Sequence, residues 1–540
     1  MDSKHYANVS ELLLDAFSRH ANLPAFTCFG HTVTYAEIDV LSARFASYLQ
    51  HHSGLKPGDR IAIQLPNVLQ YPVVLYGAIR AGLVVVNTNP LYTSRELLHQ
   101  LKDSGAKALV VLANVANHAA EILPQTQVEK VIVTEIGDLL PTPKRQLINF
   151  VVKHIKKMVP PFEFSQAIGI REALKLGEQK PFTPVPVSSE TLLVLQYTGG
   201  TTGVAKGAML SHGNLCANVR QVLNHMTKLF KTKSQVVAVA LPLYHIFAFN
   251  IHGLCAVARG AHNILIPNPR DLPAFVKAIK PYKVSLFVAV NTLYNSLLRS
   301  EDFRKLDFSE LKTSAGGGMA VTEGVAKNWL ELTGCEICEG YGLTETSPVL
   351  ITNPDNAIKT GTIGTPVIDT EIKIANEQGE EVPDGEPGEL WARGPQVMSG
   401  YWQKPEATAE VLTPDGWFKT GDIAIRRPDG YYKIVDRKKD MILVSGFNVY
   451  PNEVEDVVTQ HPDIIEAAVI GVPNQGSGET VKLFVVTGGK SVPEEEIIAF
   501  CRERLTAYKI PKIIEYRDSL PKSNVGKILR RELRDPSPHA

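Results

Sequence analysis

Up to about Ile363, the chain alternates between apolar residues at helical spacing and short continuous apolar runs. Residues 34–52 place four large apolar side chains on one side of a helical wheel, which predicts an amphipathic helix. These side chains are Ile38, Leu41, Phe45 and Tyr48. The short runs are β-rich and end in turn residues; they are DRIAIQLPN, KALVVLAN, VEKVIVTEI, LLVLQY and VVAVALPL. Alternating helices and strands predict an α/β architecture with largely parallel sheets.

The pattern changes from about Ile363 onward. Turn residues become frequent and the runs between them are short, as in VPDGEPGELWARGPQVMSGYW and TPDGWFKTGDIA, which predicts a β-rich subdomain. After DRKKDMILVSG the alternation of strand and helix patterns returns, which predicts a small α/β unit. We therefore expect an α/β multidomain protein with a large N-terminal domain over 1–435 and a small C-terminal domain over 436–540.

Composition narrows the class of protein. A chain of 540 residues exceeds what one hydrophobic core usually covers, so several domains or subdomains are expected. Lys+Arg and Asp+Glu both number 56, and this zero net charge argues against a general nucleic-acid binder. Six cysteines in so long a chain indicate a reducing compartment, and we expect a cytoplasmic protein. Cys335 and Cys338 form one CxxC without a second ligand pair at suitable spacing, so we interpret them as ordinary buried cysteines.

The apolar stretches of the sequence do not read as membrane spans. The start, MDSKHYANVSELLLDAF, lacks the pattern of a signal peptide. The uncharged runs 61–79 and 234–258 contain prolines and polar residues, which favours buried core.

Segment 141–162 has a different character, because it contains no acidic residue. Its lysines, Lys153, Lys156 and Lys157, lie opposite an apolar side at helical spacing; that side comprises Leu147, Ile148, Val151, Ile155, Met158 and Val159. Two interpretations stay open. The segment is either a basic amphipathic helix at an anionic membrane surface or an internal helix with a solvated basic face.

The stretch YTGGTTGVAKG, residues 197–207, has the residue types of a phosphate-binding loop. Glycines allow backbone amides to approach phosphate oxygens, hydroxyls donate hydrogen bonds, and a lysine adds positive charge. The candidates are Thr198, Gly199, Gly200, Thr201, Thr202, Gly203 and Lys206. Because Gly207 follows Lys206, the Walker pattern GxxxxGK[ST] is not met. The alternative for this stretch alone is a solvated glycine turn.

Three further stretches carry candidate chemistry. In EGYGLTETSP, residues 339–348, the side chain of Tyr341 could stack on a base, while Thr344 could donate to phosphate and Glu345 could hold Mg²⁺ or stabilise a helix start. In GWFKTGDIA, Asp422 could accept two ribose hydroxyls or stabilise its own turn. In PKSNVGKILRREL, Lys527 follows a glycine in a basic run, where most lysines are surface charges.

Taken together, these stretches resemble the adenylate-forming superfamily of acyl-CoA synthetases, luciferases and peptide-synthetase adenylation domains. Five motifs stand in the expected order over nearly the whole chain: the loop 197–207, GYGLTE, TGD, DRKKDMILVSG and Lys527. LPLYHIFAF, SAGGGMA and DMILVSGFNVYPNEVEDVV further resemble bacterial long-chain fatty acid–CoA ligases.

The resemblance implies an AMP-forming ligase that works in two half-reactions. A fatty carboxylate attacks the α-phosphorus of ATP to give an acyl-adenylate and pyrophosphate. The thiol of coenzyme A then attacks the acyl carbon and releases AMP. The resemblance implies Mg²⁺ with ATP, coenzyme A as co-substrate, and a place in fatty-acid metabolism such as β-oxidation. It also implies that the small C-terminal domain is mobile and rotates between the half-reactions.

The resemblance implies roles residue by residue. Lys527, Thr344 and Glu345 act on the reacting groups, and Glu345 is the Mg²⁺ ligand. The residues expected to bind ATP and AMP are Thr198, Gly199, Gly200, Thr201, Thr202, Gly203, Lys206, Gly316, Gly317, Gly318, Tyr341, Asp422 and Arg437. The remaining expectations are His245 and Phe249 in the acyl pocket, Gly446 on the coenzyme A path, and Lys439 at the hinge, where some members have Asp.

Three other functions remain open from the sequence. They are a medium-chain or aryl (4-coumarate-like) acyl-CoA ligase, an adenylating enzyme that loads a carrier protein, and a non-catalytic lipid- or nucleotide-binding protein. Since the chain ends soon after Lys527, a fused carrier domain is not expected. The expected partners are a fatty acid, ATP and coenzyme A, with no nucleic acid. Peripheral contact with the anionic cytoplasmic face of the inner membrane and a homodimer are further expectations.

Overall fold

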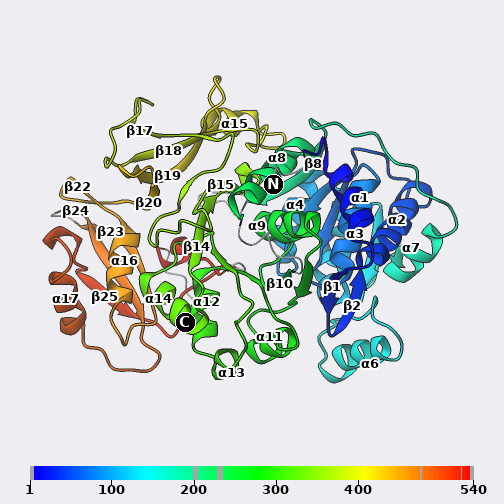
Figure 1. Cartoon of the computed structure of the whole chain (residues 1–540), viewed down its shortest axis with the longest axis horizontal. Helices are drawn as coiled ribbons and strands as arrows, with labels where there is room; N and C mark the ends of the chain where they lie inside the picture. Colours follow the sequence, from blue (N-terminus) through cyan, green and yellow to red (C-terminus); the bar gives the residue numbers. More distant parts are fainter. Residues whose placement is uncertain (1–4, 199–204, 228–234, 475–476, 524–525, 535–540) are drawn as a thin grey trace.

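The computed structural model describes residues 5–198, 205–227, 235–474, 477–523 and 526–534. Within these ranges the strands form four sheets (Figure 1). Two large sheets with their helices fill the centre and right of Figure 1, a four-stranded sheet lies at the top, and a five-stranded sheet forms a small unit at the left. The multidomain α/β fold class predicted from the sequence is confirmed.

The seven-stranded sheet is parallel except at its last strand pair, where β8 and β9 form a hairpin. Its order is β7 (Ala167–Gly169), β6 (Lys130–Thr134), β5 (Ala108–Leu112), β3 (Arg60–Gln64), β4 (Val84–Asn87), β8 (Leu192–Thr198) and β9 (Lys206–Ser211). Four of these strands occupy apolar runs that the sequence predicted to be strands. The helices α4 (Ser94–Ser104), α5 (Ala116–Ile122) and α7 (Ile170–Gly177) belong to the same part of the chain.

The nine-stranded sheet is parallel in its middle and antiparallel at both ends. Its order is β16 (Thr365–Pro366), β15 (Val349–Thr352), β14 (Ile337–Gly342), β13 (Thr313–Gly316), β12 (Leu286–Ala289), β10 (Val236–Val239), β11 (His262–Leu265), β1 (Pro24–Cys28) and β2 (His31–Thr34). Parallel strands bring their carboxyl ends to one edge, which is where α/β sheets usually bind ligands.

One apolar core joins the two large sheets. Helices contribute to it between the sheets; they are α1 (Val9–Arg19), α2 (Tyr35–His51), α3 (Gln70–Arg80) and α8 (His212–His225). Helix α2 begins at a capping box, because the Thr34 side chain accepts from the amide of Glu37 while the Glu37 carboxylate accepts from that of Thr34. Three residues of its apolar stripe, Ile38, Phe45 and Tyr48, are buried, and Leu41 is partly buried against the same core.

A second apolar core surrounds Trp329 on the other side of the nine-stranded sheet from β10 to β14. The helices that contribute to it are α11 (Leu272–Ile279), α12 (Asn291–Leu298), α13 (Glu301–Arg304) and α14 (Glu323–Thr333). The Trp329 ring lies 4.6 Å from that of Tyr294 and 5.3 Å from that of Phe287, and its indole N–H donates to Ser314 Oγ at 2.9 Å. This core supports the strand ends β13 and β14 that carry several candidate site residues.

Beyond Ile363 the predicted β-rich region forms an antiparallel four-stranded sheet. Its strands are β17 (Glu371–Ala375), β18 (Gly388–Arg393), β19 (Phe418–Arg426) and β20 (Tyr432–Arg437), with α15 (Pro405–Val411) between β18 and β19. The small unit follows with β21 (Ile442–Val444), β22 (Phe447–Val449), α16 (Pro451–Thr459), β23 (Glu466–Asn474), β24 (Gly478–Val486), α17 (Glu494–Arg502), β25 (Ile513–Tyr516) and α18 (Arg530–Arg534). Its five strands have their own apolar core.

The basic segment 141–162 forms α6 (Lys144–Phe150), which continues as a π-helical turn, η3 (Val151–Ile155). The side chain of Asn149 ties the helix to the protein, because Asn149 Oδ1 accepts from the Gly137 amide at 2.8 Å. Much of the predicted apolar side is exposed, however: 64% of Leu147 and 65% of Ile155 are accessible. The interpretation of this segment as an internal helix is therefore wrong for these side chains.

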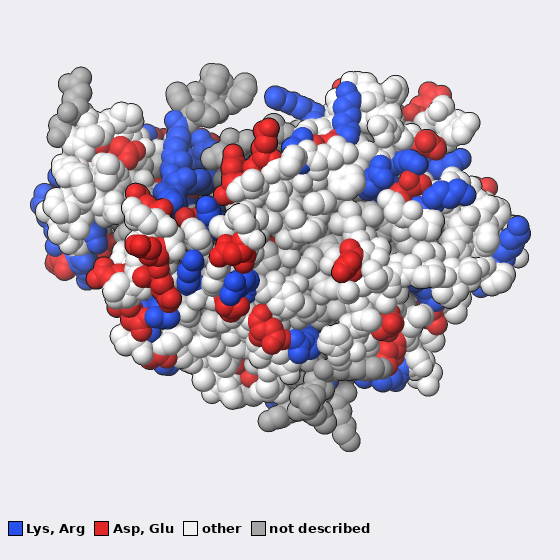
Figure 2. All heavy atoms as spheres, turned by 90° about the horizontal axis from the view of Figure 1, so that it is seen from above, with Lys and Arg blue, Asp and Glu red and all other residues white. Residues whose placement is uncertain are grey.

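Charge is spread over the surface. In Figure 2, basic and acidic side chains alternate with broad uncharged areas, and a compact basic group lies left of centre, towards the small C-terminal unit. The six cysteines are all free and buried, including Cys335 and Cys338, as expected. Among the described residues, no helix is both long and apolar enough to cross a membrane.

Candidate active site

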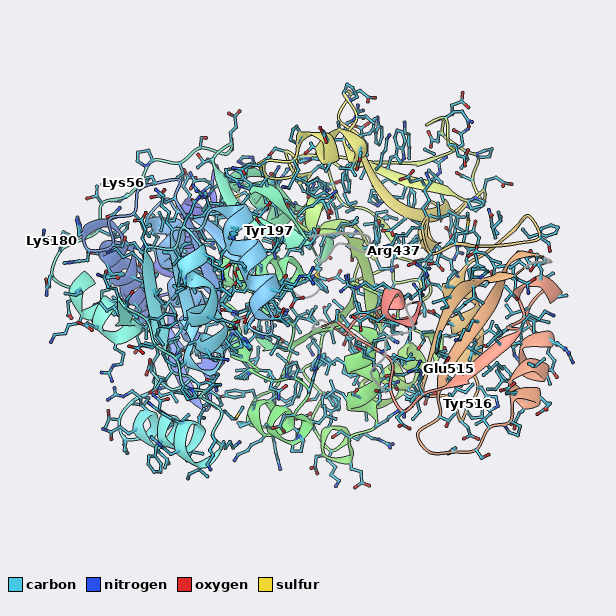
Figure 3. The ribbon with its side chains drawn as sticks, turned by 180° about the vertical axis from the view of Figure 1, so that it is seen from behind. Lys56, Lys180, Tyr197, Arg437, Glu515 and Tyr516 are labelled. Carbon is cyan, nitrogen blue, oxygen red and sulfur yellow. The ribbon has the colours of Figure 1, made fainter. Side chains whose placement is uncertain are left out.

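The phosphate-loop candidates flank a hairpin. Thr198 ends β8 and pairs with Lys206, which begins β9, so the two ends of the loop face each other across the ladder. Tyr197, labelled in Figure 3, anchors the base of the hairpin, because its hydroxyl donates to Asp103 Oδ2 at 2.7 Å. Gly199, Gly200, Thr201, Thr202 and Gly203 lie outside the described residues.

Glu345 lies in a short 3₁₀ turn, η6 (Thr344–Thr346), immediately after β14. The Tyr401 hydroxyl donates to Glu345 Oε1 at 2.7 Å, and Lys206 Nζ lies 5.2 Å from the centre of the same tyrosine ring. Burial raises the pKa of the Glu345 carboxyl, while the hydrogen bond from Tyr401 and the charge of Arg437 oppose that shift. Glu345 and Lys206 therefore lie beside the same tyrosine, and Thr344 precedes Glu345 in the same turn.

Asp422 and Arg437 face each other from neighbouring strands, β19 and β20. Arg437 Nε lies 3.6 Å from Asp422 Oδ1, and the Tyr341 hydroxyl donates to Asp422 Oδ2 at 2.6 Å. Tyr341 comes from β14, so the contact ties the four-stranded sheet to the nine-stranded one. Arg437 is labelled in Figure 3, where it lies at the junction of the four-stranded sheet and the small C-terminal unit.

The glycine that ends β13 and the two that follow it are closely packed, so a side chain at any of them would meet neighbouring atoms. A Cβ on Gly316 would lie 2.7 Å from Val321 Cγ2, and one on Gly317 would lie 3.0 Å from the Phe247 ring. Gly318 has a φ of +80°, and a Cβ there would lie 3.2 Å from Lys527 Cε. A larger residue at Gly318 would therefore be strained and would displace Lys527.

Lys527 reaches this site from the small C-terminal unit. It lies close enough to Arg437, Asp422 and Glu345 for all three charges to act on its ammonium group. Burial, and next the Arg437 guanidinium, lower the pKa of Lys527 to about 8, while the two carboxylates oppose that shift. A buried lysine with a lowered pKa among charged side chains of both signs is typical of a functional site.

Of the two acyl-pocket candidates, His245 lies near Lys527. His245 precedes α9 (Ile246–Asn250), and its Nδ1 accepts from the Phe247 amide at 3.3 Å. Burial and the nearby charge of Lys527 lower the pKa of His245 to about 3, so the imidazole is neutral at pH 7. Phe249 is fully buried in the core between the large sheets.

The two remaining candidates lie after β20. Lys439 follows Arg437 by two positions and its side chain is exposed. Gly446 is at the turn of the β21–β22 hairpin, with a φ of +84° and no atom within 4 Å of a Cβ built on it. Lys439 lies close enough to Arg437 and Asp422 for their charges to act on its ammonium group, and burial, the larger effect, lowers its pKa to about 8.

The Mg²⁺ expected with ATP requires few protein ligands. The described residues contain no cluster of three or more acidic, His or Cys side chains that could hold a metal by themselves. Mg²⁺ is usually held by one or two carboxylates together with substrate phosphates. Glu345 fits this arrangement, because Tyr401 occupies Oε1 and leaves lone pairs on Oε2 for a cation.

Two residues of this site escaped the sequence analysis. The Tyr401 hydroxyl contacts Glu345, which is 56 positions away in the sequence. The backbone of Tyr401 pairs with that of Ala208 in an isolated β-bridge, which local sequence patterns do not predict. Glu339 is buried behind Gly316, where it accepts from the amide of Val321 at 3.0 Å, and burial raises its pKa to about 7. Its place at the start of EGYGLTETSP was the one available signal.

Comparisons with known proteins agree with the geometry. The family of AMP-binding enzymes matches residues 13–402, and the family of AMP-binding enzyme C-terminal domains matches residues 453–527. The long-chain-fatty-acid–CoA ligase of Escherichia coli O6:H1 is 52% identical, over 98% of this chain and 94% of that protein. A feruloyl-CoA synthase of Amycolatopsis is 36% identical, over 94% of each chain.

The fold is also shared with a solved structure. An anthranilate CoA ligase, crystallised with anthranoyl-AMP, superposes with a TM-score of 0.87 at 25% identity, over 98% of this chain and 97% of that one. The family match covers more than half of the chain. The chain belongs to the AMP-binding enzyme family, the adenylate-forming superfamily that its motifs resemble.

Proposed function

We propose that this protein is an AMP-forming long-chain fatty acid–CoA ligase. The first half-reaction joins a fatty carboxylate to the α-phosphorus of ATP and releases pyrophosphate. The second transfers the acyl group to the thiol of coenzyme A and releases AMP. The observation that carries the proposal is the position of Lys527 beside Asp422, Arg437 and Glu345, in a chain half identical to ligases of that name.

The physical difficulty of the first half-reaction is that an anion attacks a phosphate that is already negative. Fixed cations and donors must therefore offset the charge that develops at phosphorus. Lys527 supplies one such cation, and the lysine at the start of β9, Lys206, supplies another towards the outer phosphates. Mg²⁺, when bound by Glu345 and phosphate oxygens, adds further positive charge. Thr344 donates to the α-phosphate.

The remaining residues position the nucleotide and the acyl chain. Asp422 accepts the ribose hydroxyls and Arg437 holds that carboxylate in place, which their 3.6 Å contact supports. The adenine lies between Tyr341 and the backbone of three glycines at the carboxyl end of β13, namely Gly316, Gly317 and Gly318. The loop formed by Thr198, Gly199, Gly200, Thr201, Thr202 and Gly203 holds the β- and γ-phosphates. His245 and Phe249 line the acyl pocket.

The second half-reaction requires the Lys527 segment to leave before a thiol can approach. We propose that the chain divides into 1–435 and 436–540, and that the small domain turns at Lys439. The exposed side chain of Lys439 supports this hinge, because a turn of the backbone there need not uncover a buried side chain. Gly446 then lies on the path of the coenzyme A arm, where a side chain would obstruct it.

The experiment that tests this function measures AMP, pyrophosphate and CoA esters together. The protein is supplied with ATP, Mg²⁺, coenzyme A and fatty acids of increasing length, with 4-coumarate in a parallel series. We expect long-chain acids to give the highest kcat/KM. Dominance of 4-coumarate would favour the aryl alternative, to which the feruloyl-CoA synthase likeness points. Pyrophosphate release without any CoA ester would direct attention to a carrier protein, and no acid-dependent pyrophosphate would contradict ligase activity.

We further propose that the helix α6 and the turn η3 contact an anionic membrane surface. This element lies at the lower edge of the molecule in Figures 1 and 3. It presents four large apolar side chains that are 53% to 65% exposed: Leu147, Phe150, Ile155 and Met158. Lys153, Lys156 and Lys157 are exposed beside them, and basic residues next to an apolar face favour anionic lipid headgroups.

Vesicle flotation tests the membrane contact. We expect the protein to float with vesicles of phosphatidylglycerol and phosphatidylcholine but not with phosphatidylcholine alone. The double variant Leu147→Ser/Ile155→Ser should stay at the bottom of the gradient, whereas Leu330→Ser, which alters an exposed leucine on α14, should float normally. Flotation that ignores anionic lipid, or that survives the double variant, would contradict this contact. The expected homodimer is a separate prediction that sedimentation velocity can check.

A further inference from the structure

Arg530 lies three positions after Lys527, at the start of α18, and it is the centre of an almost buried group of charges. Only 15% of its side chain is exposed. Its partners come from β20, from the segment after it and from α16; they are Glu455 Oε2 at 2.8 Å, Asn452 Oδ1 at 2.7 Å, Asp440 Oδ2 at 3.6 Å and Asp436 Oδ1 at 3.9 Å. A buried charge of this kind is stable only while its partners stay in place.

Asp436 connects this group to the nucleotide site. It is completely buried at the end of β20, where Oδ2 accepts from the Asn452 amide and Oδ1 from the Arg437 amide, both at 2.7 Å. The next residue, Arg437, points to the other face of the strand and contacts Asp422. The Asp436 carboxylate therefore accepts a hydrogen bond at the start of α16 and faces Arg530. It also fixes the backbone of Arg437, which is a candidate for binding the ribose.

The chain between Lys527 and Arg530 is too short and too constrained to absorb a movement. Lys522 and Ile528 form a β-bridge, and the Ser523 amide donates to the Lys527 carbonyl at 2.7 Å. A shift of Arg530 therefore shifts the backbone of Lys527 as well. Figure 3 shows the short red helix α18 close to the labelled Arg437.

We propose that the contact of Arg530 with Asp436 is a positioning device, which fixes Lys527 relative to the Asp422–Arg437 pair for the adenylation half-reaction. Arg530 and Asp436 touch no substrate; they act through the two residues that do. The contact joins residues on either side of Lys439, so it must form for the first half-reaction and is dispensable for the second. This inference rests on the proposed function and assigns that site two further residues.

The alternative is that packing alone holds the segment. Ile528 and Leu533 lie in an apolar cluster with β23, and this cluster could place Lys527 without help from the charges. The two explanations differ in the effect of a charge-neutral substitution of the same shape. Asp436→Asn removes the charge that faces Arg530, but it preserves the volume, the apolar cluster, and the contacts of Arg530 with Glu455 and Asp440.

The test compares Asp436→Asn and Arg530→Gln with the wild-type protein and with Arg531→Gln. Arg531 is the matched control, because it is an adjacent arginine on the same helix whose side chain is 56% exposed. Each full-length protein is assayed for single-turnover pyrophosphate release with ATP and oleate, and separately for oleoyl-CoA formation from supplied oleoyl-adenylate. Thermal unfolding of each variant reports whether the small unit stays folded.

We expect Asp436→Asn to slow pyrophosphate release by roughly 10- to 100-fold, the range that a misplacement of about 1 Å produces. Thioester formation from oleoyl-adenylate should stay within about twofold of wild type, as should both half-reactions of Arg531→Gln. Arg530→Gln should show the same selective loss. If that variant does not fold, Asp436→Asn decides the question by itself.

The pH dependence of pyrophosphate release provides a second measurement, which a change in stability alone would not alter. The groups that face Lys527 are Arg437 on β20, Asp422 on β19, Glu345 in η6 and His245 before α9. A lysine that is no longer held among them becomes hydrated, so the alkaline limb of pyrophosphate release should move to higher pH in Asp436→Asn.

Two outcomes would overturn the inference. One is an equal loss of both half-reactions in Asp436→Asn, and the other is adenylation as fast as in Arg531→Gln with an unmoved alkaline limb. Failure of the proposed function looks different, because wild type and Arg531→Gln would then release no oleate-dependent pyrophosphate.

Discussion

Replacing Lys527 by alanine is the substitution that most sharply separates the two half-reactions. It removes one cation from a group that also contains Asp422, Glu345 and Arg437. For a charge about 4 Å away and an effective dielectric constant near 20, Coulomb's law gives about 4 kcal/mol. Loss of one fixed donor at comparable sites costs about 2.7–4 kcal/mol, which corresponds to a rate loss of about 100- to 1,000-fold.

The assay follows both steps in single turnovers. Acyl-adenylate formation is timed after mixing enzyme, ATP and oleate, and thioester formation is timed after mixing enzyme, oleoyl-adenylate and coenzyme A. We expect the first rate to fall at least about 100-fold and the second to survive largely intact. Lys512→Ala is the control, because Lys512 is exposed on the same small unit. Equal impairment of both steps, or a loss shared by the control, would refute the role assigned to Lys527.

Four further predictions follow from the site and the cores. Because the pKa of Lys527 is about 8 and its protonated form is the one required, kcat/KM for adenylation should fall about fivefold from pH 8 to pH 9, and Lys527→Arg should lack this limb if it retains activity. Tyr401→Phe removes the donor to Glu345, so half-saturation should require about tenfold more Mg²⁺; an unchanged requirement would contradict that contact. Gly446→Val should leave pyrophosphate release intact but slow thioester formation, and a normal second step would exclude Gly446 from the coenzyme A path. Trp329→Ala should destabilise the protein by about 3–5 kcal/mol in thermal or chemical unfolding, and an unchanged transition would mean that this core is not cooperative with the rest.

Local sequence patterns predicted many of the helices and strands and the change to an antiparallel sheet. The stripe of Ile38, Phe45 and Tyr48 is buried in α2, and strand runs such as KALVVLAN are strands of the seven-stranded sheet. The turn-rich region after Ile363 forms an antiparallel sheet, as its closely spaced runs predicted. These features depend on periodicity and turn chemistry within a few residues, which a single sequence records directly.

Contacts between distant segments could not be read from the sequence. The hydroxyl of Tyr401 reaches Glu345, and the guanidinium of Arg530 faces Asp436 and binds Glu455, only because sheets and helices from separate parts of the chain meet there. The same limit explains α6. An amphipathic pattern predicts a helix with an apolar side, but whether protein or solvent covers that side depends on elements elsewhere in the chain.

The central claim is that the carboxylate of a fatty acid attacks the α-phosphorus of ATP in this site. Oleate labelled with ¹⁸O in both carboxylate oxygens tests it directly, because the attacking oxygen stays on phosphorus when the thiol displaces the adenylate. After turnover with ATP, Mg²⁺ and coenzyme A, mass spectrometry should find one ¹⁸O in AMP and none in pyrophosphate. Label in inorganic phosphate with ADP as the other product, or AMP without label, would contradict the mechanism.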